Sequence, residues 1–133
     1  MMNRISGPFD VKVLPQKADN PQAEAAGLGR MALDKQFRGD LEATSQGEML
    51  SVLDRSTGSG GYVAMERVTG RLAGKRGSFV LQHHATMSRG NPELSIQVVP
   101  DSGTEELAGL SGSMDIRIEG KQHFYDFDYE LGS

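Results

Sequence analysis

The chain has 133 residues, with 14 Lys and Arg against 18 Asp and Glu, and a formal net charge of -4. This length predicts one domain that is stable without cross-links, and the lack of cysteine excludes disulfides, thiolate nucleophiles and zinc-thiolate sites. The negative charge argues against a nucleic-acid partner, because such binders draw their affinity mainly from clustered Lys and Arg.

Short β-branched and aromatic segments alternate with glycine-containing turns, a spacing typical of a β-sandwich or barrel. The chain from residue 1 to 133 is therefore predicted to be one all-β domain, in which residues 1–8 and 15–28 are largely loop. We predict eight strands, at Phe9–Leu14, Gly29–Phe37, Asp40–Asp54, Gly61–Ala73, Ser78–Ser88, Glu93–Val99, Gly112–Glu119 and Gln122–Leu131.

The first half of the chain contains two further local signals. Asn20 as a cap, Pro21 at the first helical position and Gly27 as a stop predict one helical turn before the second strand. Gln46-Gly47 lies inside a strand that is long for a single element, and it predicts a β-bulge there.

Two turn signals follow in the second half. Ser102-Gly-Thr-Glu105 has capping-box spacing and predicts a short helical turn that begins there. Glu119-Gly120-Lys121-Gln122 places glycine first of two central residues, which favours a type II′ hairpin.

Alternation along the strands predicts which side chains share the interior. On the fifth strand, the more apolar set contains His83, whereas His84 falls on the opposite face. On the fourth strand, two arginines on one face favour the other face as interior, and this places Glu66 inside. On the last strand the inward set is predicted to be His123, Tyr125, Phe127, Tyr129 and Leu131.

An eight-stranded barrel is just wide enough to be filled by side chains or to hold one small ligand. The polar residues expected inside are the candidate ligand or cavity residues: Glu66, His83, His123 and Tyr125. A carboxylate near a histidine in a dry cavity forms a general acid/base pair when its surroundings move both pKa values toward neutrality. A structural ion pair for Glu66 and core packing for Tyr125 are the competing interpretations.

Charge is uneven along the chain, since residues 62–92 are mainly basic and residues 101–133 mainly acidic. Two solvated faces of opposite sign are the first interpretation. Head-to-tail self-association, or an anionic ligand at the basic hairpin, is the alternative, and Arg71 is a secondary candidate on that hairpin. Ser102 and Thr104 are further secondary candidates, because their amides at the start of a short helix could hold an anion.

Other chemistries lack a signature. The three histidines do not show zinc-site spacing, no G-x-S-x-G elbow is present, and the glycine clusters lack phosphate-loop order. We therefore predict no metal and no cofactor. No apolar run suits a signal peptide or a membrane helix, so the sequence predicts a cytoplasmic protein without a membrane partner.

Several ordered segments resemble a family of small bacterial proteins known as a domain of unknown function, DUF3224. The similar segments are Gly39–Glu48, Tyr62–Arg67, Gly74–His83, Val98–Leu110 and His123–Leu131. The resemblance implies a compact antiparallel eight-stranded barrel like that of plant allene oxide cyclase. It does not imply cyclase activity, because a shared fold does not carry a function.

Two functional hypotheses follow. The first is a barrel that binds a small hydrophobic or lipid-like ligand, with cyclase or isomerase chemistry as its extension. The second is a packed, non-catalytic barrel that acts through oligomerisation or a protein partner, and a homodimer is the expected oligomer. In the second case the interior is filled by Phe79, Leu81, Ile96, Val98, Met114, Ile116, Phe127 and Leu131.

Overall fold

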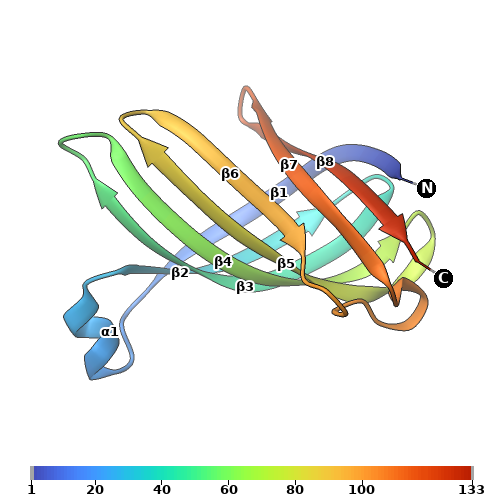
Figure 1. The fold of residues 1–133 in the computed structure, drawn as a ribbon, viewed down its shortest axis with the longest axis horizontal. Coiled ribbons are helices and arrows are strands. Elements are labelled where there is room, and N and C mark those ends of the chain that lie inside the picture. Colours follow the sequence, from blue (N-terminus) through green and yellow to red (C-terminus); the bar gives the residue numbers. More distant parts are fainter. Residues whose placement is uncertain (1, 133) are drawn as a thin grey trace.

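The computed structural model describes residues 2–132, and it is a closed barrel of eight antiparallel strands paired in chain order (Figure 1). This confirms the predicted fold class. The strands are β1 (Asn3–Gln16), β2 (Gly29–Phe37), β3 (Leu41–Asp54), β4 (Ser59–Leu72), β5 (Lys75–Ser88), β6 (Asn91–Val98), β7 (Leu110–Glu119) and β8 (Gln122–Leu131). The helix α1 (Pro21–Ala26) and the 3₁₀ turn η1 (Glu105–Leu107) complete the fold.

The first strand begins six residues before the predicted start, at Asn3 rather than at Phe9. Its early part pairs with β8, where Gly7 lies opposite Tyr125. Gly7-Pro8 resembles a turn signal in the sequence, but Gly7 has another role, because a Cβ there would lie 2.6 Å from the Tyr125 hydroxyl. The residues expected to be loop are therefore held as a strand by a partner more than a hundred positions away.

The predicted bulge at Gln46-Gly47 is wrong. Pairing of β3 with β2 and with β4 continues through both residues without a slip of register. Gly47 lies opposite Glu66, and an added Cβ would come 2.1 Å from the Met65 carbonyl oxygen. Glycine is required here by close approach of the neighbouring strand, and not by an irregular ladder.

The helical turn before β2 is confirmed, since the Asn20 side chain accepts a hydrogen bond from the Ala23 amide and Gly27 has φ 66°. The turn η1 is also confirmed, but its predicted capping is wrong. Ser102 does not cap η1: its hydroxyl donates to the Val99 carbonyl and accepts from the Val80 amide. Ser102 instead fastens the segment after β6 to β5.

The two ends of the barrel differ in how they are filled. The end near the chain termini is packed with buried apolar side chains, among which Phe79 and Phe127 stack with ring centroids 5.8 Å apart. The opposite end has the β3–β4, β5–β6 and β7–β8 hairpins and α1 around it (Figure 1). We call these the packed end and the open end.

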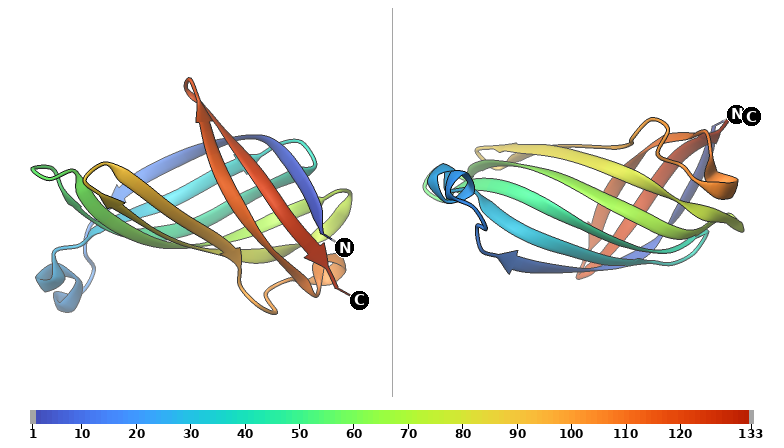
Figure 2. Two further views of the ribbon diagram at one scale, coloured as in Figure 1. Left: turned by 45° about the horizontal axis from the view of Figure 1, so that its top comes forward. Right: turned by 90° about the horizontal axis from the view of Figure 1, so that it is seen from below.

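The barrel closes most weakly between β6 and β7. Their ladder consists of the single pair Gln97 and Ser113, whereas β7 and β8 pair from Leu110 to Glu119. Both views in Figure 2 show β6 and β7 diverging toward the open end. The interior of the open end is therefore less enclosed on this side than elsewhere.

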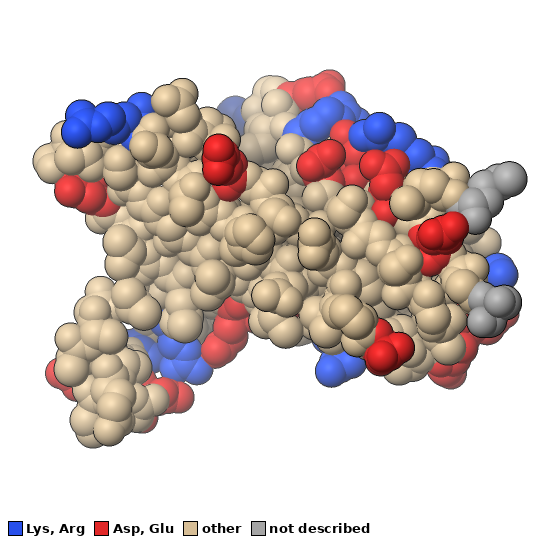
Figure 3. All heavy atoms as spheres, in the orientation of Figure 1, with Lys and Arg blue, Asp and Glu red and all other residues tan. Residues whose placement is uncertain are grey.

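Charged side chains of both signs lie near one another at the ends of the face shown in Figure 3, with a broad uncharged area between them. Acidic residues of the C-terminal segment meet basic partners from elsewhere, as Asp128 meets Arg4 at 3.6 Å. The uneven charge of the sequence is thus not sorted into separate faces on this side. Within residues 2–132, no helix has the length and apolar character needed to span a membrane.

Candidate functional site

Strand alternation and register bring four polar side chains together inside the barrel. Glu66 on β4 and His83 on β5 face inward as predicted, and both are buried. Lys35 on β2 and Ser45 on β3 are paired across their strands, and they also face inward. The four residues come from four consecutive strands and form one cluster, which we call the Glu66 cluster.

Glu66 is the centre of this cluster. Its Oε2 atom accepts a hydrogen bond from Lys35 Nζ at 2.8 Å and lies 2.6 Å from His83 Nε2. Its Oε1 atom accepts from the Ser45 hydroxyl at 2.7 Å. The side chains of Glu66, His83 and Lys35 are at most 6% exposed, so these contacts form away from bulk water.

The carboxyl of Glu66 stays ionised in this setting. Burial alone would raise its pKa, but the hydrogen bond from His83 and the positive charge of Lys35 outweigh that effect and lower the pKa to about 2. The expectation that its surroundings move the Glu66 pKa toward neutrality is therefore wrong. Glu66 is not suited to donate or accept protons near pH 7, and its role is to hold its two nitrogen partners.

The Glu66 cluster forms part of the floor of a pocket at the open end. The pocket has a volume of about 260 Å³, and Lys35 and His83 reach it from the cluster. Tyr62 and His123 also line it, and the remaining walls are Phe9, Val11, Leu33, Met49, Leu94, Ile116 and Ile118. The pocket is thus lined mainly by apolar side chains with a few polar ones among them, the usual composition of a small-molecule site.

A second pocket of about 360 Å³ lies toward the rim and shares Met49, Tyr62 and Leu94 with the first. Its lining is mostly apolar and includes Leu53 and Met87, which are exposed. The two pockets therefore adjoin each other at these residues, and the inner one reaches Lys35 and His83 of the Glu66 cluster. Because Leu94 belongs to β6 and Ile116 to β7, the inner pocket also borders the weakly paired side of the barrel.

The structure places the four predicted site residues differently. Glu66 and His83 are in direct contact, and His123 lines the same pocket with its ring 5.3 Å from that of Phe9. Tyr125 lies in the packed end, where its hydroxyl donates to the Arg38 carbonyl and accepts from the Leu41 amide. The structure therefore brings His83 and His123 to the pocket, with Glu66 buried in contact with His83, and Tyr125 fastens the β2–β3 turn.

The secondary candidates lie away from the pocket. Arg71 is exposed and lines a surface hollow near the packed end together with Glu42 and Arg76. The Thr104 amide donates to the Ser78 carbonyl, and the Ser102 amide donates to the Val99 carbonyl. These two amides are therefore used within the chain and are not available to an anion.

Lys35, Ser45 and Tyr62 were not among the predicted site residues. Lys35 had a usable signal, because it stands between Leu33 and Phe37 on the apolar face of its strand. A lysine at an inward position requires a buried anion nearby, and Glu66 was the inward acid already predicted. Ser45 had no comparable signal, since a small hydroxyl residue is common on either face of a strand.

A larger groove of about 580 Å³ lies outside the barrel, between the α1 region and the outer face of the sheet. Its charged side chains satisfy one another, since Arg30 pairs with Glu48 at 2.6 Å and with Asp19 at 3.2 Å. The groove therefore presents few polar groups that need a ligand. Among residues 2–132, no three His, Asp or Glu side chains converge in a way that could hold a metal ion.

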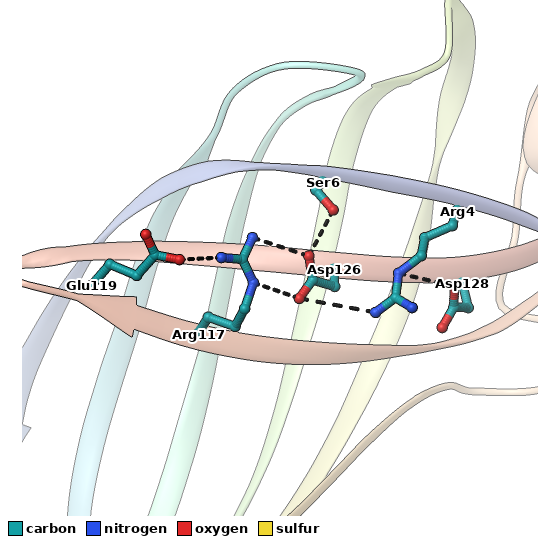
Figure 4. A network of polar contacts seen from close by, with 6 residues as sticks. All are labelled: Arg4, Ser6, Arg117, Glu119, Asp126 and Asp128. Carbon is teal, nitrogen blue, oxygen red and sulfur yellow. Dashed lines mark hydrogen bonds and ion pairs between the residues drawn. The ribbon is translucent and has the colours of Figure 1, made fainter.

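A separate polar network crosses the outer face of β1, β7 and β8 (Figure 4). Arg117 binds both carboxylate oxygens of Asp126, at 2.7 and 3.2 Å, and Ser6 donates to the same carboxylate at 2.6 Å. Arg4 and Glu119 extend the network at its two ends. The hydrogen bonds from Arg117 and Ser6 lower the pKa of Asp126, so this network ties the first strand to the last two.

Comparison with known proteins gives a matching family and a similar solved structure. The model of the family described as "Protein of unknown function (DUF3224)" matches residues 5–129. A crystal structure of a protein of unknown function from the same family, from Shewanella oneidensis MR-1, is 51% identical to this chain, with a TM-score of 0.91. The match covers 100% of this chain and 99% of the other. No curated protein matches the sequence. The agreement in sequence and fold over nearly the whole length shows that this chain belongs to the DUF3224 family.

Proposed function

We propose that this protein binds a small, largely apolar molecule in the open half of its barrel. The observation that carries the proposal is the division of the interior, with a packed end and a lined pocket above the Glu66 cluster. A barrel that serves only as a rigid body has no need of a cavity, because each unfilled space forfeits packing contacts. The apolar walls favour a hydrophobic ligand, and the polar floor favours one with a polar group at one end.

The shape of the cavity supports an elongated ligand that enters from the rim. The outer pocket is apolar and shares three residues with the inner one, so a hydrophobic chain or ring could remain in contact with protein along the whole path. Exposed Leu53, Leu94 and Ile118 at the open end are costly to leave in water, and a bound ligand would cover apolar surface there. Cyclase or isomerase activity and a cytoplasmic location stay predictions.

Native mass spectrometry of protein purified without denaturation tests the proposal. We expect an adduct of small-molecule mass that is lost when the protein is unfolded. Ala85 faces inward and lines the outer pocket, so Ala85→Trp should fill the path and abolish the adduct. Gln82→Trp places the same side chain on the outer face of β5 and should leave the adduct in place.

A weak natural ligand could be lost during purification, so a second test adds a probe. The probe is 1-anilinonaphthalene-8-sulfonate, which fluoresces in apolar sites, and its binding is measured by titration. Binding of about one molecule per chain, lost in Ala85→Trp and kept in Gln82→Trp, would support the pocket as a binding site. Equal binding by both variants would show that the probe attaches elsewhere, and the proposal would then fail.

The outer surface supports a second candidate function, in which the barrel works by pairing with another copy. Outward-facing apolar side chains lie side by side on β3 and β4, with Leu50 directly opposite Val63. Val52 and Met65 extend this strip, and all four side chains are at least 42% exposed. Exposed apolar strips of this kind favour association, and a symmetric homodimer is the simplest result.

Sedimentation velocity measures the oligomeric state directly. A dimer that becomes a monomer in Val63→Glu, with Arg67→Glu on the same face as the charge control, would support this candidate. A monomer at all concentrations would remove it and leave ligand binding as the function.

A further inference from the structure

We infer that His83, held in place by Glu66, acts as a general base in the inner pocket and removes a proton from a carbon atom of an apolar carbonyl compound. The inference rests on the proposed function, because the substrate must first occupy the pocket. It goes further by assigning an activity, a reacting atom and a substrate class. The reacting atom is His83 Nδ1.

The two ring nitrogens of His83 have different surroundings. Nε2 lies 2.6 Å from the Glu66 carboxylate, which accepts a hydrogen bond and therefore places a hydrogen on Nε2. Nδ1 has no hydrogen-bond partner within residues 2–132. Because every fully buried side-chain nitrogen or oxygen atom of the described chain has a partner, Nδ1 is not fully buried. In neutral His83, Nδ1 therefore carries the lone pair, and His83 is one of the residues that line the inner pocket.

This arrangement has the features required of an activated base. The side chain of His83 is only 3% exposed, so water competes little for its lone pair. Glu66 fixes both the tautomer and the direction of the ring, which is the part that an acidic partner plays for histidine bases in general. Glu66 is thus a positioning residue, and His83 is the residue that would touch the substrate.

Donors for the oxygen of the substrate lie at the same pocket. Tyr62 lines it with its ring centroid 6.5 Å from that of His83, and its hydroxyl has no partner within the described chain. Burial, together with the charge of Glu66, raises the pKa of Tyr62, which keeps its proton available for donation. The Lys35 ammonium uses one of its hydrogens on Glu66 and also lines the pocket, so its positive charge favours a developing oxyanion.

The reaction that fits these groups is a proton shift within one molecule. The substrate is a carbonyl compound in which one carbon separates the carbonyl group from a carbon–carbon double bond. Nδ1 takes a proton from that carbon, and the electron pair of the broken C–H bond forms a dienolate whose oxygen accepts from the donors. The imidazolium then returns the proton to a different carbon of the conjugated system, which moves the double bond. No other reactant is consumed, and substrate and product are isomers.

The probe for this activity is 5-nitrobenzisoxazole, a flat apolar carbon acid. Removal of its ring C–H proton by a base breaks the N–O bond and releases a coloured cyanophenolate. The unreactive 5-nitrobenzotriazole has the same shape and reports binding alone by calorimetry. We expect the wild-type protein to bind the triazole and to turn over the isoxazole, and His83→Gln to lower the rate about a hundredfold or more.

His83→Gln is chosen because a glutamine amide can still donate to Glu66 from near the position of Nε2, whereas it has no basic nitrogen. His84→Gln is the matched control, since His84 is the next residue and lies exposed on the outer face. That control should leave the rate unchanged. A rate that depends on His123 and not on His83 would overturn the assignment of the base.

The outcomes separate this inference from the proposed function. If the triazole binds and no reaction depends on His83, the general-base role fails while ligand binding stands. If neither compound binds, both proposals fail for ligands of this class.

A further measurement does not depend on catalysis or on the stability of a variant. Nitrogen-15 NMR of the histidine rings distinguishes a protonated nitrogen from one with a lone pair. We expect the neutral ring of His83 to carry hydrogen on Nε2 and a lone pair on Nδ1. A neutral ring with its hydrogen on Nδ1 would exclude Nδ1 as the base.

Discussion

Gly47 and Glu66 lie directly opposite each other on β3 and β4, and a Cβ at Gly47 would come 2.7 Å from Glu66 Cα and 2.8 Å from its Cβ. The space left by the missing side chain is therefore occupied by the residue at the centre of the buried cluster. Gly47→Ala should lower the free energy of unfolding by about 1–3 kcal/mol, because the backbone must move to accept the methyl group.

Denaturant unfolding measures this loss. Gly61→Ala is the matched control on β4, because its Cβ would approach nothing closer than 3.3 Å. Equal losses in the two variants would show that the contact with Glu66 has no special part in the requirement for glycine at position 47.

Lys35 and Glu66 should show strong energetic coupling. Glu66→Gln leaves the Lys35 ammonium buried without its counter-ion, and we expect a loss of about 3–5 kcal/mol. Lys35→Met together with Glu66→Gln removes both charges, and the double variant should be more stable than Glu66→Gln alone. A double-mutant cycle by urea denaturation measures the coupling, and additive losses would contradict a direct ion pair.

The stability of the protein should fall in acid because of Glu66. Its pKa is lowered from the ordinary 4.5 to about 2 in the folded state, so its stabilising contribution is fully present above pH 4.5 and is lost as the pH falls toward 2. The difference corresponds to about 3 kcal/mol.

Unfolding free energies measured between pH 2 and 6 report this contribution when the wild-type protein is compared with the Lys35→Met, Glu66→Gln double variant. The double variant should show a shallower dependence on pH, although Asp126 and other acids add their own share in both proteins. Parallel curves for the two proteins would contradict the low pKa of Glu66.

The network on the outer face should contribute to barrel closure. Asp126→Asn weakens the bidentate contact with Arg117 and the contact with Ser6, and we expect a loss of about 1–2 kcal/mol. Asp128→Asn is the matched control, because Asp128 is more exposed and pairs with Arg4 at the longer distance of 3.6 Å. Thermal unfolding at low and moderate salt measures both, and a larger loss for Asp128→Asn would contradict the central place of Asp126.

The sequence alone determined the strands, apart from the early part of β1, and the direction in which their side chains point. The inward sets containing Glu66 and His83 follow from a period of two along each strand, which is a local property of the backbone. Pro21 and Gly27 likewise predicted α1, because their conformational preferences act within a few residues. The eight-stranded barrel could be predicted because most strands are recognisable from their own residues. The resemblance to the DUF3224 family is confirmed by the match of its model.

Only the tertiary structure decided which inward side chains meet. Lys35 contacts Glu66, 31 positions away in the sequence, and the Tyr125 hydroxyl accepts a hydrogen bond from the Leu41 amide, 84 positions away. Such contacts depend on the stagger of the strands around the barrel, which sets the layer in which each inward residue lies. The stagger and the divergence of β6 from β7 also leave one end of the barrel packed and the other open. Neither property can be predicted from a single strand, because each depends on how several strands are placed relative to one another.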